Sequence, residues 1–420
     1  MKEKLTNIGI PVALLLLITV IAIAGILRVK ADEKDEAVAV TVPVELNVDG
    51  NVKGSSYGLI VTIGNENAQG SQWNQAASGA KVALERFNRS GADLHLATED
   101  DRGTDEGARQ AVENLAAQKV SGIVISSSGD HVQAAVQAAK ERNIPVILPY
   151  ENSIDDARSL QPSTESLNDV LSAEHPGGKG IIRIDQEGFA GIDVPAERTL
   201  SVNGFTDINT FSQSLVKDTA EAGSDTVVFV DASAYQEAKL TRALQEAGLK
   251  TQIVLGPQAT SPAFNDVFMK DNQSTVINAQ SIGFNAGDSV ALQSDGQGRS
   301  MSAYLQMVKI LSESKDAMSV MGDQKFSDVA ASADSRSHDA LVALVRATEH
   351  AESIAPQDVK SSLNDLKLSS ADGITSADMD FAQHHVIQDA PLLLSANAGD
   401  VEMRVADANA PSHLVWFAQA

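Results

Sequence analysis

A run of hydroxyl and glycine residues is the part of this sequence best suited to binding chemistry. Ser127, Ser128 and Gly129 follow the apolar segment Gly122–Ile125, and helical sequence begins at Asp130. The first turn of a helix has free backbone N–H groups and a positive dipole end, which together bind anions. We therefore expect an anion-binding site at these three residues, with the alternative that Ser128 only caps the helix.

Hydrolase and nucleotide-binding chemistry have no support in the sequence. Ser128, Asp130 and His131 are too close together at a helix start to form a hydrogen-bonded triad with one another, and no GxSxG motif is present. No GxxxxGK[ST] loop occurs either, and the glycine-rich segment Pro176–Gly180 precedes an expected strand, not a helix. We expect a protein that binds a molecule without transforming it and that is not an enzyme.

Metal ligands do not occur at usable spacings. The sequence contains no cysteine, so we expect no disulfide, no thiolate metal site and no lipid-modified cysteine. His384 and His385 are neighbours on an extended segment, where adjacent side chains point to opposite faces. Asp100, Asp101 and Asp105 lack the spacing of a calcium loop. We expect no metal and no cofactor.

Strand and helix patterns alternate around the expected anion site. Short apolar runs are followed by stretches in which apolar residues recur at helical spacing. This alternation predicts an α/β fold with a parallel, doubly wound sheet, which binds ligands at the carboxyl ends of its strands. The expected elements are strand 58–63, helix 75–87, strand 93–97, helix 105–118, strand 122–125, helix 130–142 and strand 144–148.

The alternation restarts after residue 162 and predicts a second doubly wound sheet. Between residues 188 and 203 there is room for a strand but little for a full helix. Residues 300–366 contain helical patterns and few strands, so we expect the chain to return there to the first lobe. The expected elements are helix 167–173, strand 180–184, helix 208–222, strand 225–230, helix 235–247, strand 251–255, helices 300–312, 337–351 and 356–366, and strand-like segments 391–394 and 414–417.

The N-terminal segment is long and apolar enough to cross a bilayer. Ile8–Leu27 contains no charge and follows two lysines, which favours insertion with the N-terminus inside. Val29-Lys30-Ala31 has the small-residue spacing of a signal-peptidase site, so residues 1–31 form either a cleaved signal peptide or a membrane anchor. Residues 32–56 are predicted to be a spacer, in which Val42–Val48 could add an edge strand.

Acidic residues dominate the chain beyond Ala31. Removing the charges of residues 1–31 from the totals of 32 Lys and Arg and 56 Asp and Glu leaves 28 basic against 55 acidic residues, a net charge of about −27. Nucleic acid and anionic membrane surfaces repel such a protein. We expect no nucleic-acid partner, and the charge favours solubility in an external medium over recognition of a cationic partner.

Several landmarks, taken in order, resemble the type I periplasmic binding proteins, and among them the Leu/Ile/Val-binding proteins that serve ATP-driven (ABC) transporters. The likeness runs from about Tyr57 to the C-terminus. It implies two similar lobes, residues 57–153 with 282–376 and residues 154–281 with 377–420, joined by three hinge crossovers near Ser153, Ser281 and Ser376. The landmarks are Gly79–Glu85, Glu99–Asp101, Ser127–Gly129, Ile144–Pro149, Ala247–Gln252 and Ser337–Ala340.

The resemblance implies a ligand pocket between the lobes. In the family, a hydroxyl pair before a helix holds the ligand carboxylate, and Ser127, Ser128 and Gly129 stand at that point here. Trp73 lies in the loop that lines the family's pocket, where an aromatic residue can cover the ligand; the alternative is that it packs against its own helix. No metal or cofactor is implied.

Other positions depart from the family's pattern. Tyr150, Glu151 and Asn152 replace a small residue and a Thr, and Gln258 replaces the acid that pairs with the ligand ammonium. Ser233 stands near a position often held by Tyr, and Tyr235 follows two residues on. An α-amino group then lacks its counter-charge unless Glu151 or Asp231 supplies it.

The ligand hypothesis that follows from these departures is a small polar molecule with an anionic or amide end: an amino acid, an amide or a small carboxylate. We expect an extracytoplasmic solute-binding protein that delivers this ligand to an ABC-type permease. The alternative is a membrane-tethered sensor or structural protein with the same fold, held in the membrane by residues 8–27.

Overall fold

The computed structural model describes the chain from Pro43 onward, with short gaps. The described residues are 43–64, 68–189, 191–220, 223, 225–270, 279–398, 404 and 414–418. The apolar segment Ile8–Leu27 and the rest of the expected signal peptide or anchor lie outside these residues. In the described part of the chain, no helix is long and apolar enough to cross a membrane.

A parallel sheet of five strands forms the first lobe, in the spatial order β2-β1-β3-β4-β5. The sequence predicted the first four strands, and three of them, β1, β3 and β4, are short runs buried on both faces. Strand β2 lies at the edge of the sheet and is only partly buried. Strand β5 has only two residues and therefore gives no periodic signal. The strands are β1 (Ser56–Val61), β2 (His95–Asp100), β3 (Ile123–Ser126), β4 (Val146–Leu148) and β5 (Arg158–Ser159).

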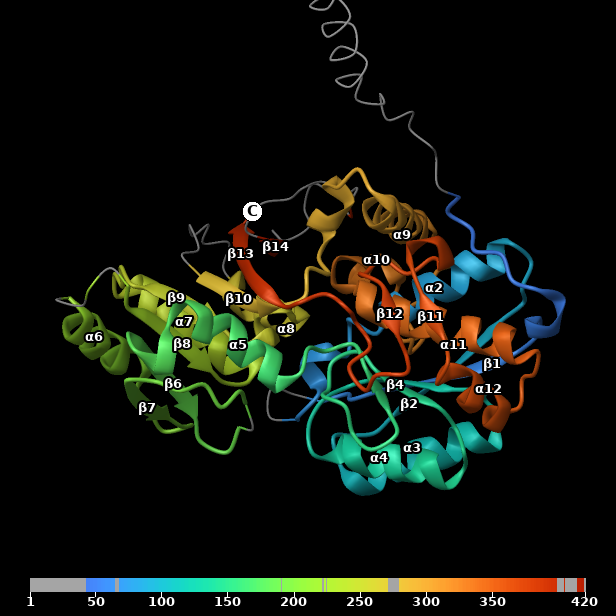
Figure 1. Ribbon diagram of the computed structural model, residues 1–420, viewed down its shortest axis with the longest axis horizontal. Coiled ribbons are helices and arrows are strands. Elements are labelled where there is room, and N and C mark those ends of the chain that lie inside the picture. The colour runs from blue at the N-terminus through green and yellow to red at the C-terminus, as the bar shows by residue number, and fades with distance from the viewer. Residues whose placement is uncertain are drawn as a thin grey trace, which may run out of the picture. The chain divides into compact units, whose positions relative to one another are not determined.

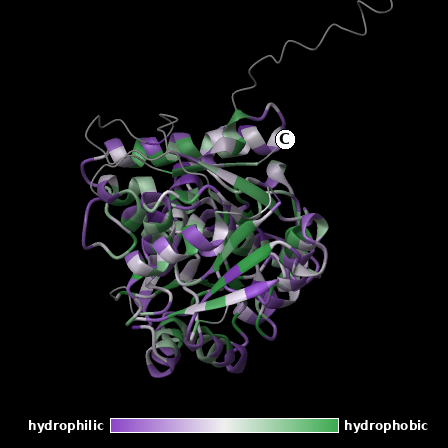
Figure 2. Ribbon diagram, turned by 90° about the vertical axis from the view of Figure 1, so that its left-hand side faces the viewer, coloured by the Kyte–Doolittle hydropathy of each residue, from purple (hydrophilic) through white to green (hydrophobic). Residues whose placement is uncertain are grey.

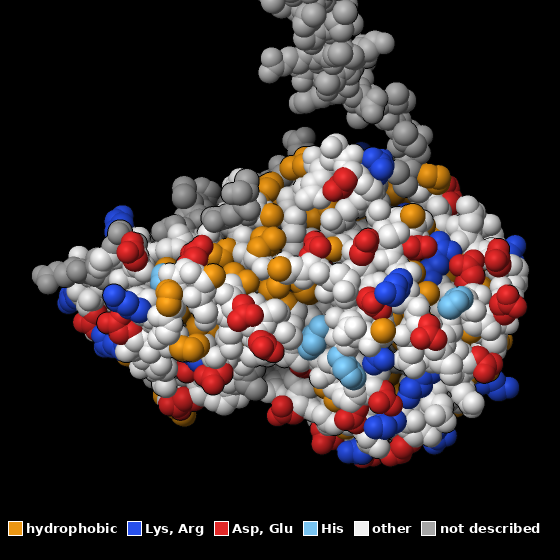
Figure 3. All heavy atoms as spheres, in the orientation of Figure 1, with side chains coloured by type: hydrophobic (Ala, Val, Ile, Leu, Met, Phe, Trp, Pro, Cys, Tyr) orange, Lys and Arg blue, Asp and Glu red, His pale blue; other side chains and the backbone are white. Residues whose placement is uncertain are grey.

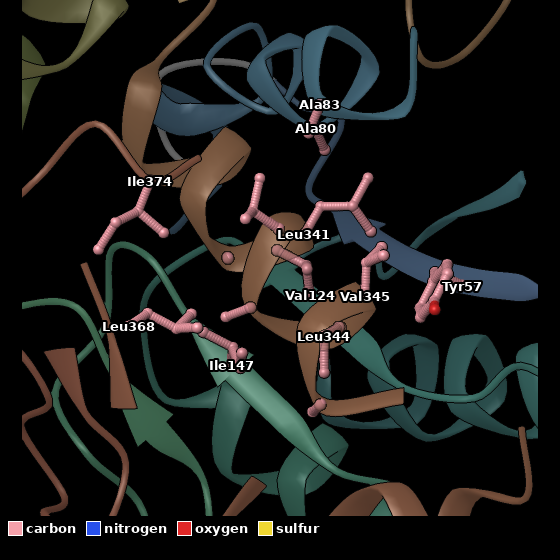
Figure 4. Packing of buried hydrophobic residues seen from close by; sticks show 14 of the residues in the cluster. Tyr57, Ala80, Ala83, Val124, Ile147, Leu341, Leu344, Val345, Leu368 and Ile374 are labelled. Atoms are coloured by element: carbon pink, nitrogen blue, oxygen red, sulfur yellow. The ribbon is translucent and has the colours of Figure 1, made fainter. Parts of the chain in front are cut away.

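Helices cover both faces of the first sheet (Figure 1). Leu341, Leu344 and Val345 of α11 point into the space between the sheet and the small residues Ala80 and Ala83 of α2 (Figure 4). Helix α11 comes from a distant part of the chain, as the shortage of strands after residue 300 predicted. One face carries α3 (Asp105–Ala117) and α4 (His131–Glu141); the other carries α2 (Ser78–Arg89), α11 (Ser335–Ala351) and α12 (Pro356–Leu363).

Two further helices pack on the outside of α2. Val82 of α2 lies in a hydrophobic cluster with residues of α9 (Gly296–Glu313) and α10 (Phe326–Val329). Tyr304 of α9 is fully buried in this cluster, and its hydroxyl donates to the carbonyl of Ala333 at 2.9 Å. The cluster extends the first lobe beyond the layer that covers the sheet.

A sheet of seven strands forms the second lobe, in the order β14-β13-β10-β9-β8-β6-β7. Its five parallel strands repeat the order of the first sheet: numbered along the chain within each lobe, both read 2-1-3-4-5. Strand β13 pairs antiparallel with β10, and β14 pairs antiparallel with β13 at the edge of the sheet. The strands are β6 (Ile181–Gln186), β7 (Arg198–Val202), β8 (Val227–Asp231), β9 (Gln252–Leu255), β10 (Ala279–Gly283), β13 (Leu392–Ala398) and β14 (Leu414–Ala418).

Helices also cover both faces of the second sheet. In Figure 2 some strands are mainly hydrophobic and others carry hydrophilic residues too, whereas the helices are mixed, as expected when only one side of each helix faces a sheet. No helix occurs among the described residues between β6 and β7, as the shortness of that segment predicted. One face carries α5 (Thr164–Glu174); the other carries α6 (Ile208–Thr219), α7 (Ala234–Glu246) and α8 (Pro262–Phe268).

The chain changes lobes later than expected at the first and third crossovers. Strand β5 still pairs with β4 of the first sheet, so the first crossover follows Ser159 and not Ser153. The short strands β11 (Lys367–Leu368) and β12 (Met379–Asp380), together with Phe381, belong to the first lobe's core. The third crossover therefore lies just before β13 and not near Ser376. Ser281 lies within β10, immediately before the second crossover.

Residues 43–55 pack on the first lobe. The expectation that residues 32–56 form a spacer is therefore wrong for this part of the segment. The Arg86 guanidinium donates to the carbonyl of Val44 at 2.8 Å, and the N–H of Leu46 donates to the carbonyl of Arg86 at 3.0 Å. The expected edge strand does not form, since residues 43–49 pair with no strand. The alternating apolar side chains enter two different clusters, Val44 in one and Leu46 and Val48 in the other.

Surface charge follows the composition. Acidic side chains are spread over the visible face, with basic side chains among them (Figure 3). The net negative charge of the chain is therefore not confined to one patch of that face.

Candidate ligand-binding cleft

A cavity of about 750 Å³, which we call the cleft, lies where the carboxyl-end loops of both sheets meet. Its walls come from the loops after β1, β3 and β4 in the first lobe and after β6, β8 and β9 in the second. Doubly wound sheets bind ligands at this edge, and small-molecule sites have volumes of about 300–1,000 Å³. Eight of the ten expected ligand-binding residues line the cleft: Ser128, Gly129, Tyr150, Glu151, Asn152, Ser233, Tyr235 and Gln258.

The backbone donors at the start of α4 are already used by the protein's own side chains. The N–H of Gly129 donates to Glu151 Oε2 at 2.7 Å, and the N–H of Asp130 donates to Gln69 Oε1 at 3.2 Å. The second oxygen of Glu151 accepts from the N–H of Asn152 at 2.8 Å. Burial raises the pKa of Glu151, and these N–H groups and His131 oppose that rise. A carboxylate therefore does bind at the expected anion site, but it belongs to the chain itself.

Ser127 does not line the cleft, contrary to expectation. Its side chain is fully buried beneath the cleft, where its Oγ lies 2.6 Å from Thr62 Oγ1 and 3.1 Å from His131 Nε2. Thr62 in turn donates to Asp101 at 2.6 Å. Ser127 thus belongs to a buried polar network that holds the loops after β1, β2 and β3 together, because its side chain points into the lobe.

This network does not have the geometry of a catalytic triad. His131 Nε2 lies 3.1 Å from both Ser127 Oγ and Asp101 Oδ2. A triad needs the serine and the aspartate on different ring nitrogens, so that the histidine can pass a proton between them. Here both groups contact the same nitrogen, and the arrangement orients His131 without activating Ser127.

Gln72 bridges the two lobes across the cleft. Its Nε2 donates to Ser128 Oγ in the first lobe at 2.9 Å and to Gln258 Oε1 in the second at 3.2 Å. Sequence reasoning expected Gln258 to replace a ligand-binding acid but missed Gln72. A polar loop residue gives no periodic signal, so only the folded arrangement reveals the bridge.

Trp73 lies behind the cleft wall, which corrects the expectation that it lines the pocket. Its side chain is 1% exposed and stacks on the ring of Tyr150, with centroids 4.2 Å apart and planes 3° apart. The Arg336 guanidinium lies 4.9 Å from each ring centroid and pairs with Asp334 at 2.7 Å. Trp73 therefore supports Tyr150, which does line the cleft and whose hydroxyl lies 2.8 Å from Ser337 Oγ.

The second lobe supplies a polar wall whose groups largely form hydrogen bonds to other residues of the protein. Both the N–H and the hydroxyl of Ser233 donate to Gln186 Oε1, at 3.0 and 2.9 Å. Tyr235 presents its hydroxyl to Ser71 Oγ of the first lobe at 3.4 Å. The two residues lie at the start of α7, as their place after β8 predicted.

Two buried acids lie in this wall. Asp231, at the end of β8, pairs with Arg183 at 3.1 Å, and burial raises its pKa to about 7 despite that partner. Glu237, in the first turn of α7, is fully buried, and its Oε1 accepts from the N–H of Gly256 at 2.8 Å. Its Oε2 has no hydrogen-bond partner, and burial raises its pKa well above the usual range. Sequence reasoning missed Glu237 because an acid in a first helical turn is ordinary.

The cleft is acidic as a whole. Four carboxyl groups line it, and no Lys, Arg or His is among the described residues of its wall. The acids are Asp130, Glu151, Asp231 and Glu237.

Comparison with known proteins identifies the fold. No protein-family model matches the sequence, and no curated protein matches it. Solved structures do match over most of their length. One is the branched-chain amino acid transporter substrate-binding protein LivJ from Streptococcus pneumoniae in complex with isoleucine: TM-score 0.57, 14% identity, 87% of this chain and 100% of that chain covered.

Two further solved structures agree. A type 1 periplasmic binding protein from Bordetella pertussis matches with a TM-score of 0.59 and 14% identity over 86% of this chain and 98% of that chain. An ABC transporter solute-binding protein from R. palustris in complex with 4-hydroxybenzoate matches with a TM-score of 0.56 and 13% identity over 87% and 96%. The two lobes with their matching strand order thus have the type I periplasmic binding protein fold.

Proposed function

We propose that this chain, with its type I periplasmic binding protein fold, is an extracytoplasmic solute-binding protein. It traps a small polar ligand between its lobes and presents the closed form to an ABC-type permease. The observation that carries the proposal is the cleft itself: equivalent edges of two sheets of the same strand order face one cavity of about 750 Å³. The ligand classes considered from the sequence are an amino acid, an amide or a small carboxylate.

Contacts between the lobes support a closing motion. Gln72 reaches Gln258 at 3.2 Å, and Arg336 Nη2 donates to Thr260 Oγ1 at 3.2 Å. Each contact joins a single pair of side chains, and three chain crossovers connect the lobes. Rotation about a few crossover residues can make or break such contacts while each lobe stays intact.

The solved structures support a binding role and leave the ligand open. Proteins of this fold were captured with ligands as different as isoleucine and 4-hydroxybenzoate. The fold therefore carries the lobes and the cleft, and the lining residues decide which molecule binds. Two of the matched proteins are named as solute- or substrate-binding proteins of transporters, which supports a role in binding and not in catalysis.

Placement outside the cytoplasm rests on the sequence. The apolar segment Ile8–Leu27 would carry the chain across the membrane and then either be cleaved or remain as an anchor. Retention of the anchor would favour the alternative role of a membrane-tethered ligand sensor, because a tethered receptor stays beside its signalling partner.

Mass spectrometry of the purified protein tests the proposal. The full chain is purified without denaturation and then denatured, and the released small molecules are identified. We expect one molecule per chain. A Ser233→Trp variant, which fills the cleft, should release none, whereas Ser214→Trp at an exposed position of α6 should release as much as the unmodified chain. Equal release from both variants would contradict binding in the cleft.

A further inference from the structure

We propose that the ligand is a small organic cation: it carries an ammonium or guanidinium group that Glu237 and Asp231 bind, and it has no carboxylate at the start of α4. This inference rests on the proposed solute-binding function and names the ligand class of the same cleft. It departs from the anionic or amide end that the sequence favours.

Side chains of the protein already occupy the anion site at the start of α4. Glu151 occupies the N–H groups of Gly129 and Asn152 at 2.7 and 2.8 Å, and Gln69 occupies that of Asp130. Ser128 Oγ accepts from Gln72. A ligand carboxylate would have to displace Glu151 or Gln69 from these N–H groups, or bind to the Ser128 hydroxyl beside the carboxylate of Glu151. Two neighbouring carboxylates repel each other strongly where water is excluded, so a ligand with an anionic end is disfavoured.

Glu237 has an unsatisfied carboxyl oxygen. The residue lines the cleft and is fully buried, and its Oε2 has no hydrogen-bond partner. A buried polar atom without a partner costs free energy, which a ligand donor would recover. A cationic N–H donor suits this atom best because it supplies both the hydrogen bond and the counter-charge.

Negative charge gathers around Asp231. Its partner Arg183 also contacts Asp185 and Asp193, so one guanidinium faces three carboxylates. The group as a whole remains negative beside Glu237. The described residues of the cleft wall include no Lys, Arg or His. A cationic ligand therefore supplies the positive charge that balances these carboxylates.

The cleft acids should change protonation when a cation binds. Burial raises the pKa of Asp231, Glu237 and Glu151. Asp231 faces the charged groups of Arg183, Asp185 and Asp193, and Glu237 faces Asp231. Glu151 faces His131 and Asp130. A bound cation favours the ionised carboxylates. Cation binding is therefore expected to release protons and to tighten as pH rises.

Calorimetry with four small molecules that differ in charge tests the inference. The full chain is titrated with butylamine, butanamide, butanoate and leucine. We expect butylamine to bind at least about tenfold more tightly than butanamide, because hydrogen bonds to charged groups exceed those to neutral groups. Butanoate and leucine should bind more weakly still. Glu237→Gln, which keeps the acceptor for Gly256, should remove the preference for the amine.

A matched control is Glu246→Gln, an exposed acid near the end of the same helix, which should leave the preference intact. If butanoate or leucine binds the unmodified chain more tightly than butylamine, the cation inference is overturned while the solute-binding function stands. If none of the four binds and no molecule is released from the purified chain, the solute-binding function fails, and the inference fails with it.

Discussion

The carboxylate of Glu151 accepts a hydrogen bond from the backbone N–H of Gly129 at 2.7 Å, at the start of α4. Proteins bind anions at helix starts because the N–H groups there are free. In this chain, a side chain from the loop between β4 and β5 fills that position.

Removing the Glu151 side chain should open the anion site. In Glu151→Ala the N–H groups of Gly129 and Asn152 lose their acceptor, and a negative charge leaves the cleft. Leucine and butanoate should bind at least about tenfold more tightly than to the unmodified chain, since two N–H donors to a carboxylate become available. Calorimetry measures the change, with Glu141→Ala at the exposed end of α4 as the control. Unchanged affinity for both ligands would show that Glu151 does not block the site.

The Gln72–Gln258 hydrogen bond should contribute to closure. Because it joins the lobes, Gln72→Ala and Gln258→Ala should each weaken butylamine binding. A double-mutant cycle should give a coupling free energy of about 0.5–1.5 kcal/mol, the net value of one hydrogen bond. Binding constants of the two single variants and the double variant provide the measurement. Strictly additive losses would mean that the two side chains do not interact when the ligand binds.

The buried Asp231 should make stability depend on pH in an unusual direction. Its folded pKa of about 7 lies above the ordinary value of 3.8, so between these values the folded state holds more protons than the unfolded state. Its contribution to stability is therefore complete below pH 3.8 and is lost as the pH rises to about 7, by at most about 1.4 kcal/mol per pH unit.

Urea denaturation of the ligand-free chain across this range measures the effect. Asp231→Asn should flatten the decline, whereas Asp316→Asn at an exposed position should not. A decline of equal slope in the Asp231→Asn chain would assign the pH dependence to other groups, such as Glu237.

The stack of Trp73 on Tyr150 should be structural. Trp73→Ala removes a fully buried ring and should cost about 3–5 kcal/mol of unfolding free energy. Tyr150→Phe keeps the stack and removes only the hydrogen bond to Ser337, so it should cost about 1 kcal/mol. Urea denaturation distinguishes the two. A Trp73→Ala chain of unchanged stability that fails to bind ligand would instead restore Trp73 as a lid.

The strands and helices were predictable because their apolar residues recur at regular spacing. The order of the elements also predicted that the helices after residue 300 return to the first lobe. The short strand β5 and the alternation at Val42–Val48 misled sequence reasoning: β5 has two residues, and the side chains around Leu46 enter separate clusters. The spacing of apolar residues along the chain does not predict which hydrophobic cluster each side chain enters.

The site was predictable only as a set of loops. The positions after the strands led to eight residues of the cleft wall. The orientation of Ser127 and the contact of Glu151 with Gly129 depend on tertiary geometry, because the two partners in that contact are separated by a whole helix and strand. Glu237 was missed for a related reason: its burial depends on α8 and the loop after β9, which pack around α7.

Closure of the lobes on a small molecule is the central claim, and a distance measurement between the lobes tests it most directly. The chain has no cysteine, so spin labels attach only at introduced sites, Arg109→Cys in α3 and Gln213→Cys in α6, both exposed. Electron–electron double resonance then reports the distance with saturating butylamine, butanamide, butanoate or leucine. We expect butylamine to shorten the distance and narrow its distribution. An unchanged distance with all four compounds would contradict the account.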